Sequence, residues 1–131
     1  MQSRHVSTVI HRPAAEVYAY VAEPDHLVAW ASGLAQGELE RQGDSLLVDS
    51  PMGRVTVRFV ARNDLGVLDH DVTLPSGTVV TNPVRVLEHP DGAEVLFTVR
   101  QIELDDEELE RDVRRVAADL TRLKAILERS A

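Results

Sequence analysis

Apolar residues along this chain follow two different periods, and the change between them predicts its elements. Between residues 37 and 101 the apolar positions recur at every second residue, which is the period of a strand with one buried face. Between residues 106 and 129 they recur at steps of four and three, which is the period of an amphipathic helix. Residues 4–10 alternate like the central region and predict one further strand. The pattern therefore predicts an α+β protein that begins with a strand and ends with a long helix.

Two short helices are expected between the first strand and the central region. Pro13 can open the first helix, because its missing N–H costs nothing at the first helical position. Pro24 ends that helix, and Asp25 can cap a second helical piece that ends near Trp30. The first helix has one apolar face, formed by Ala14, Val17, Tyr18 and Val21.

Short turn signals divide the central region into six strands. They lie at Gln42-Gly43, Pro51-Met52, Asp64-Leu65-Gly66, Pro75-Ser76-Gly77 and Pro90-Asp91-Gly92. Turns this short join antiparallel neighbours, because parallel strands need a much longer crossover. Together with the first strand, the six strands predict one curved, seven-stranded antiparallel sheet.

The turns also predict which residues face each other across the sheet. A four-residue loop at 63–66 places Phe59 opposite His70, and a three-residue loop at 75–77 places His70 opposite Asn82. The same loops and those near residues 51 and 90 predict further pairs: Arg62 with Val67, Leu46 with Val57, Val48 with Val55, Val57 with Val72, Val72 with Val80, Val84 with Phe97, Val86 with Val95, and Asn82 with Val99.

All of these loops place the same set of apolar residues on one face of the sheet. On the other face Arg54 falls opposite Asp49 and Arg58 opposite Asp71, and these opposite charges support the register. The apolar face consists of Leu46, Val48, Val55, Val57, Phe59, Ala61, Leu68, Val72, Leu74, Val80, Val84, Val86, Val95, Phe97 and Val99.

The C-terminal helix supplies a cover for that apolar face. Its length of about 36 Å, at 1.5 Å per residue, is enough to cross the sheet. Asp105 and Glu108 have the spacing of a capping box at its start. Its apolar stripe consists of Leu109, Val113, Val116, Leu120, Leu123 and Leu127.

Composition narrows the classes of protein that remain. The 131 residues fit one domain, 1–131, and 14 Lys and Arg against 22 Asp and Glu give a net charge of −8, which disfavours nucleic acid as a partner. Cysteine is absent from the sequence, the histidines lack metal-ligand spacing, and no glycine-rich phosphate loop follows a strand, so we expect neither a metal nor a cofactor. No run is long and apolar enough for a membrane span and no export signal is evident, which predicts a cytoplasmic protein.

This order of elements is that of the helix-grip fold, and the sequence resembles the START-related (SRPBCC) superfamily of polyketide cyclase/dehydrase-like proteins. The segments that carry the resemblance are IHRPAAEVYAY at 10–20, EPDHLVAWASGL at 23–34, LDHDVTLPSGTVVTNPVRV at 68–86 and ELERDVRRVAADLTRLKAILE at 108–128. They mark a fold and carry no catalytic signature. The resemblance implies a hydrophobic small molecule bound between the sheet and the long helix, and only some members of the superfamily are enzymes.

His70 is the candidate for chemistry. The register places it on the apolar face between Phe59 and Asn82, whereas Asp69 and Asp71 point the other way. It is either a ligand-contacting base or donor, or a core histidine that Asn82 satisfies. Burial without an interior carboxylate predicts a pKa below the usual value of about 6.5.

Three classes of function are compatible with these observations. We favour the binding of a hydrophobic small molecule by a monomer or homodimer, in a pocket that could equally be packed core. The alternatives are a cyclase or dehydratase that acts on an aromatic or polyketide-like substrate with His70 as base, and a co-chaperone-like interaction module. The expected pocket residues are Tyr18, Trp30, Val57, Phe59, His70, Val72, Asn82, Val84, Phe97, Val113, Val116 and Leu120.

Overall fold

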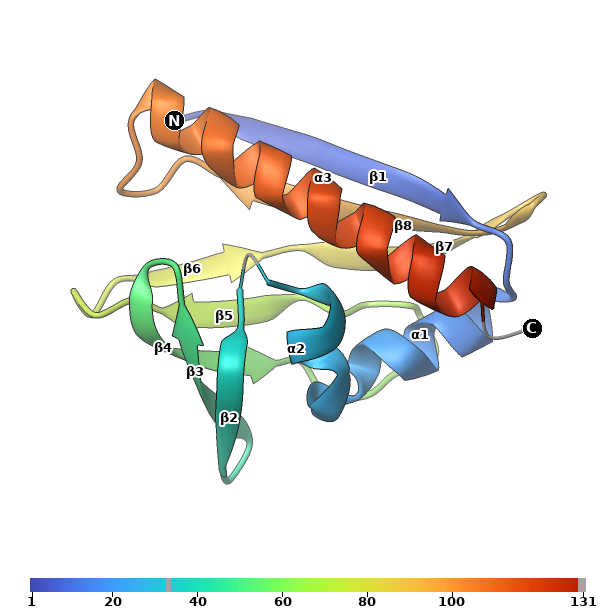
Figure 1. Ribbon diagram of the computed structural model, residues 1–131, viewed down its shortest axis with the longest axis horizontal. Coiled ribbons are helices and arrows are strands. Elements are labelled where there is room, and N and C mark those ends of the chain that lie inside the picture. Colours follow the sequence, from blue (N-terminus) through green and yellow to red (C-terminus); the bar gives the residue numbers. More distant parts are fainter. Residues whose placement is uncertain (33, 130–131) are drawn as a thin grey trace.

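The computed structural model describes residues 1–32 and 34–129. Gly33, inside the 23–34 segment, and the last two residues of the expected 1–131 domain lie outside the described residues. The long helix α3 (Asp106–Arg129) runs alongside strand β1 (Ser3–Ile10) and packs on it, as Figure 1 shows. The predicted α+β class and the long C-terminal helix are confirmed.

The strands form two antiparallel sheets, so the expectation of one seven-stranded sheet is wrong. One sheet has the order β1-β8-β7 and the other the order β2-β3-β4-β5-β6. The bounds of the first are β1, β7 (Val84–His89) and β8 (Gly92–Arg100). Those of the second are β2 (Gln36–Gln42), β3 (Ser45–Ser50), β4 (Gly53–Phe59), β5 (His70–Thr73) and β6 (Val79–Asn82).

Pro83 explains the division of the sheet. The sequence pattern reads continuously from residue 79 to 89, but a proline has no N–H to donate to a ladder and interrupts pairing. Its carbonyl instead accepts a hydrogen bond from the Thr98 N–H at 2.9 Å. The chain therefore pairs with β5 before Pro83 and with β8 after it.

The residues before β5 join the two sheets. The Val84 N–H donates to Asp69 Oδ1 at 2.9 Å, and the Leu68 N–H donates to the Val84 carbonyl at 2.8 Å. The Val86 N–H donates to the Gly66 carbonyl at 2.9 Å. Gly66 has a φ of 75°, and a Cβ there would lie 2.2 Å from the Val86 carbonyl oxygen, so this close approach requires glycine.

This junction replaces the tight hairpin expected at 63–66. Strand β4 ends at Phe59 and β5 begins at His70, so the predicted pair of Arg62 with Val67 is wrong and Ala61 is exposed. The Asn63 side chain organises the intervening loop, because it bonds the backbone of residues 61, 65 and 67.

The register of the central strands is otherwise confirmed. Phe59 pairs with His70, and His70 pairs with Asn82. The pair of Asn82 with Val99 does not occur in a ladder, because β6 ends at Asn82 and β8 pairs with β7. The other predicted pairs that occur are Leu46 with Val57, Val48 with Val55, Val57 with Val72, Val72 with Val80, Val84 with Phe97, and Val86 with Val95. The pairs Asp49 with Arg54 and Arg58 with Asp71 occur on the opposite face.

Two short helices precede the second sheet, as expected. They are α1 (Ala14–Ala22) and α2 (Leu27–Trp30), separated by the 3₁₀ turn η1 (Pro24–His26). Asp25 does not cap α2: its own N–H donates to the Glu23 side chain at the start of η1, so that expectation is wrong. The capping box of α3 is confirmed, since Asp105 and Glu108 exchange hydrogen bonds of 2.8 and 2.9 Å.

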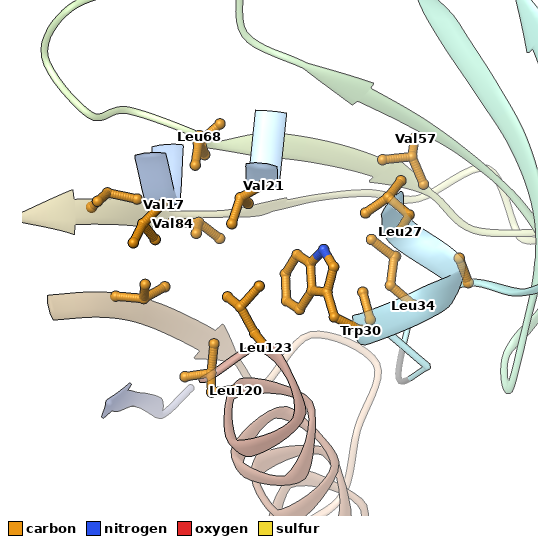
Figure 2. Close-up of a cluster of buried hydrophobic side chains, with 14 of the residues drawn as sticks. Val17, Val21, Leu27, Trp30, Leu34, Val57, Leu68, Val84, Leu120 and Leu123 are labelled. Carbon is orange, nitrogen blue, oxygen red and sulfur yellow. The ribbon is translucent and has the colours of Figure 1, made fainter. Parts of the chain in front are cut away.

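The core lies between the two sheets, α1, α2 and the inner face of α3, and Figure 2 shows part of it. Along α3 the stripe is buried at Leu109, Leu120, Leu123 and Leu127. It is only half-buried at Val113 and Val116. The helix therefore packs tightly at its C-terminal half and less closely around Val116.

Candidate functional site

A cavity of about 70 Å³, here called the inner chamber, lies beside Val116 between α3, α2 and the strands. Its walls are mostly apolar, with a few polar side chains set among them, which is the usual composition of a small-molecule site. The lining residues are Val21, Leu27, Trp30, Ala31, Leu34, Met52, Phe59, His70, Asn82, Val84, Phe97, Val99, Asp112, Arg115, Val116 and Asp119.

A wider cavity of about 320 Å³, here called the vestibule, adjoins the inner chamber. The two share four lining residues: Met52, Asn82, Val99 and Asp112. The rest of the vestibule comes from the turn between β5 and β6, from the segment between β8 and α3, and from nearby strand and helix residues: Val72, Leu74, Pro75, Ser76, Val80, Arg100, Ile102, Glu103, Leu104 and Glu108. The two cavities therefore adjoin each other along this shared wall.

His70 forms part of the wall of the inner chamber and is only 3% exposed. Its ring is tilted against Phe59, with centroids 4.9 Å apart, and meets the edge of Phe97 at 5.8 Å. Burial lowers the pKa of His70 from 6.5 to about 4, the direction that the register predicted. The imidazole is therefore neutral near pH 7.

The hydrogen bonds of His70 indicate its tautomer. Nδ1 lies 3.3 Å from the Leu68 carbonyl oxygen, which can only accept, so Nδ1 carries the proton. Nε2 then presents a lone pair, and the nearest donor is Asn82 Nδ2 at 3.4 Å. Both distances are long for hydrogen bonds, so Nε2 retains capacity to accept from a ligand.

Trp30 also lines this chamber, and its ring carries a buried hydrogen-bond donor. Its side chain is 3% exposed, and its Nε1 is buried with no hydrogen-bond partner among the described residues. A buried N–H without a partner costs about 1–3 kcal/mol. Such a group in the wall of a cavity is suited to a ligand that offers an acceptor.

Two carboxylates of the chamber wall were missed from the sequence, one of them buried and the other half-buried. Asp112 and Asp119 lie in the chamber wall on either side of Val116. Asp119 is 5% exposed and accepts hydrogen bonds from the Ser32 hydroxyl and from Arg122, both at 3.0 Å. Burial raises the pKa of Asp112, whose Oδ1 lies 3.5 Å from Arg115 Nη1.

A signal for these carboxylates was present in the spacing of the helix. Asp112, Val116 and Asp119 follow steps of four and three and so share one face. The predicted stripe contains only the apolar residues of this helix and therefore leaves out the two aspartates on the same face. The expectation that no carboxylate reaches the interior is therefore wrong, and Asp119 is engaged by Ser32 and Arg122 rather than set against His70 as a triad would require.

The expected pocket residues separate into three groups in the structure. Trp30, Phe59, His70, Asn82, Val84, Phe97 and Val116 line the inner chamber, and Val72 together with Asn82 lines the vestibule. Val57 and Leu120 lie in packed core, and Val113 lines neither cavity. Tyr18 lies elsewhere, where its hydroxyl accepts from the Asn63 N–H at 2.9 Å.

The described residues contain neither a metal-binding cluster nor a membrane-spanning helix. No group of three or more His, Cys, Asp and Glu side chains in residues 1–32 and 34–129 is placed to hold a metal ion. Within the same part of the chain, no helix is long and apolar enough to cross a membrane.

Comparison with known proteins gives the family. Residues 1–128 match the family model described as polyketide cyclase / dehydrase and lipid transport. The chain belongs to this family. Among curated protein sequences, none matches the chain significantly.

Solved structures with the same fold share little sequence with this member of the polyketide cyclase/dehydrase and lipid transport family. The Aha1 dimer from Colwellia psychrerythraea is 15% identical, with a TM-score of 0.76 over 98% of this chain and 97% of that chain. DynU16, a protein of the dynemicin biosynthetic locus, is 16% identical, with a TM-score of 0.76 over 98% of this chain and 48% of that chain. XoxI from Bacillus cereus is 16% identical, with a TM-score of 0.68 over 96% of this chain and 95% of that chain.

The family description covers both ring-forming chemistry and lipid transport, so membership leaves the choice between catalysis and binding to the site. The features of the site that bear on this choice are the neutral His70, the two adjoining cavities, and the Trp30 N–H that has no partner among the described residues.

Proposed function

We propose that this chain, as one domain over residues 1–131, binds an apolar small molecule in the inner chamber and vestibule. The observation that carries the proposal is the inner chamber itself, a mostly apolar cavity with a small number of polar groups in its wall. A fully packed core beneath α3, together with an exposed apolar patch, would instead have favoured a protein-interaction module.

The state of His70 favours binding over catalysis. A general base is most effective when its pKa lies near the operating pH, and burial lowers the pKa of His70 to about 4. The neighbouring carboxylates do not compensate: Asp69 is held by Arg85, and Asp71 accepts a hydrogen bond from the Thr81 hydroxyl. A neutral imidazole in this position serves better as a hydrogen-bond acceptor for a ligand. Cyclase or dehydratase activity with His70 as base stays a prediction for an enzyme assay.

The proposal is tested by direct measurement of binding. The neutral fluorophore 1-aminoanthracene should be taken up by the full-length protein with increased emission. Quenching of Trp30 should accompany the uptake, because Trp30 is the only tryptophan in the chain and lies in the chamber wall. Native mass spectrometry of the protein as purified, with a denatured control, would show a ligand carried through purification.

A matched pair of variants locates the binding. Val116→Phe adds bulk to the wall of the inner chamber and should abolish or strongly weaken uptake. Val79→Phe adds the same bulk at an exposed position outside both cavities and should leave uptake unchanged. Equal uptake by the two variants, or none by the unmodified protein, would contradict the proposal.

A further inference from the structure

Two residues of the inner-chamber wall, Trp30 and His70, carry a donor and an acceptor that the described residues leave largely unsatisfied. The donor is the Trp30 indole N–H, which is buried and has no partner among the described residues. Figure 2 shows its nitrogen on the side of the ring that faces away from Leu120 and Leu123 of α3, in the space between Val21 and Leu27. The N–H therefore points toward the sheet that closes the other side of the chamber.

The acceptor lies on that sheet. In Figure 2, Leu68 and Val57 lie on the side toward which the indole nitrogen points. His70 follows Leu68 by two residues on the same face, and pairs with Phe59, which follows Val57 by two. His70 and Trp30 both line the inner chamber, and among the described residues the nearest donor to His70 Nε2 is Asn82 Nδ2, at a long 3.4 Å.

We infer that the inner chamber selects a ligand with a neutral hydroxyl group, an apolar alcohol or phenol, whose oxygen accepts from Trp30 and whose proton is donated to His70 Nε2. This inference rests on the proposed function and names the class of its ligand. A hydroxyl is the smallest neutral group that accepts and donates at once. A carbonyl or ether satisfies only the tryptophan, and an ammonium group satisfies only His70, because it has no lone pair to accept from Trp30.

The charges in the wall disfavour an anionic headgroup. The chamber is lined by two carboxylates, Asp112 and Asp119, against one guanidinium, Arg115. Arg115 already lies 3.5 Å from Asp112 Oδ1, and Asp119 is held by Ser32 and Arg122. A carboxylate that entered would lose its hydration and meet no free cation in this lining.

The sizes of the two cavities give the orientation of the ligand. The inner chamber measures about 70 Å³ and the adjoining vestibule about 320 Å³. A ligand larger than the chamber therefore places its hydroxyl end inside and its apolar remainder against the vestibule residues, among them Val72, Leu74 and Ile102.

Three nearly isosteric probes test the inference: p-cresol, p-xylene and 4-methylbenzoate. They differ only in a hydroxyl, a methyl or a carboxylate at one ring position. With ¹⁵N-labelled full-length protein, the single tryptophan contributes one indole N–H resonance. We expect p-cresol to bind about tenfold or more tightly than p-xylene, because the site's polar groups are left unpaired by the analogue. We also expect p-cresol alone to move the indole proton resonance downfield, and 4-methylbenzoate to bind most weakly.

Variants of His70 separate the acceptor from the shape of the ring. His70→Phe keeps a ring and should reduce the preference for p-cresol over p-xylene to near unity. His70→Gln keeps an acceptor and should retain part of the preference, which also covers the case in which the phenylalanine variant fails to fold. His11→Phe, at an exposed histidine, is the matched control and should keep the full preference.

The outcomes distinguish this inference from the proposed function. Equal affinity for p-cresol and p-xylene, or p-cresol binding without a shift of the indole resonance, would overturn the hydroxyl assignment. If 1-aminoanthracene is still taken up in that case, the proposed binding function stands. Failure of all four compounds to bind would overturn both.

Discussion

At the scale of single residues, the fold changes His70 from a titratable side chain into a neutral one. The ring lies among Phe59, Phe97 and the Leu68 carbonyl, with 3% of its surface exposed. Desolvation is the largest cause of its lowered pKa, and the nearby Asp69 and Asp71 only partly oppose it. Because the buried imidazole is held neutral in the folded protein, its protonation at low pH favours the unfolded chain.

The stability of the protein should depend on pH through this residue. In the unfolded chain His70 takes up a proton below about pH 6.5, whereas in the folded protein it does so only near pH 4. Stability is therefore full above pH 6.5 and falls as the pH drops toward 4, by about 3 kcal/mol in total. Urea unfolding between pH 4 and 7 measures this loss, and NMR titration of the imidazole gives its pKa directly.

Two variants separate His70 from the other titrating groups. His70→Phe should lose the His70 part of the slope between pH 4 and 6.5, whereas His11→Phe should keep it. A His70 pKa at or above 6.5, or an unchanged slope in His70→Phe, would be inconsistent with a neutral imidazole in the chamber wall.

At the scale of elements, the junction between the sheets depends on Asp69. Its carboxylate accepts two hydrogen bonds from the Arg85 guanidinium, at 2.8 and 2.9 Å, and one from the Val84 N–H at the start of β7. The hydrogen bond from Arg85 is the largest cause of the lowered pKa of Asp69. The contact ties the residue before β5 to the strand that follows Pro83.

Removal of this carboxylate should loosen the junction. Asp69→Ala leaves the Val84 N–H without its partner, and we expect a loss of about 1–3 kcal/mol in the free energy of unfolding. Asp71→Ala, two residues away on the exposed face, is the control and should cost roughly 0.5 kcal/mol or less. Urea denaturation of both variants checks the difference, and equal losses would show that the junction does not depend on Asp69.

The long helix has a tightly packed part and a part that borders the cavity. Leu120 is 1% exposed within the core, whereas Val116 is half-buried and lines the inner chamber. We expect Leu120→Ala to cost about 2–4 kcal/mol, because it creates a void in packed surroundings. Val116→Ala should cost less, since it only enlarges an existing cavity. Urea unfolding of the two variants measures the contrast, and a loss below roughly 0.5 kcal/mol for Leu120→Ala would argue against a packed contact.

At the scale of the whole molecule, the wall of the inner chamber combines α2, α3 and strands of both sheets. A molecule bound there would contact elements that must stay together for the site to exist. A ligand that binds only the folded state stabilises it by mass action.

Thermal unfolding should therefore reveal the ligand. At a p-cresol concentration about 100 times its Kd, we expect roughly 2.7 kcal/mol of added stability and a rise in Tm of about 10 °C. The chamber-filled variant Val116→Phe should show no rise, whereas Val79→Phe should respond like the unmodified protein. An equal rise in both variants would place the binding outside the inner chamber.

Local features of the sequence determined the elements and much of the register. Alternation and turn residues placed Phe59, His70 and Asn82 in one row across three strands, because side-chain direction in a strand depends only on residue parity and the turns determine which residues pair. The buried environment of His70 followed from that row. The capping box of α3 could be predicted for the same reason, since its partners are three residues apart.

Only the tertiary structure decided where the chain divides into two sheets and which side chains meet beneath α3. The turn near residue 90 predicts the pairing of β7 with β8, but alternation continues through Pro83, so no local pattern shows that the ladder with β5 ends there. Leu120 and Val116 belong to the same stripe, yet one fills the core and the other borders a cavity, because packing density depends on the elements opposite them. Trp30 and His70 likewise reach one cavity wall from a helix and a strand, and periodicity within one element carries no information about which side chains of other elements share a cavity.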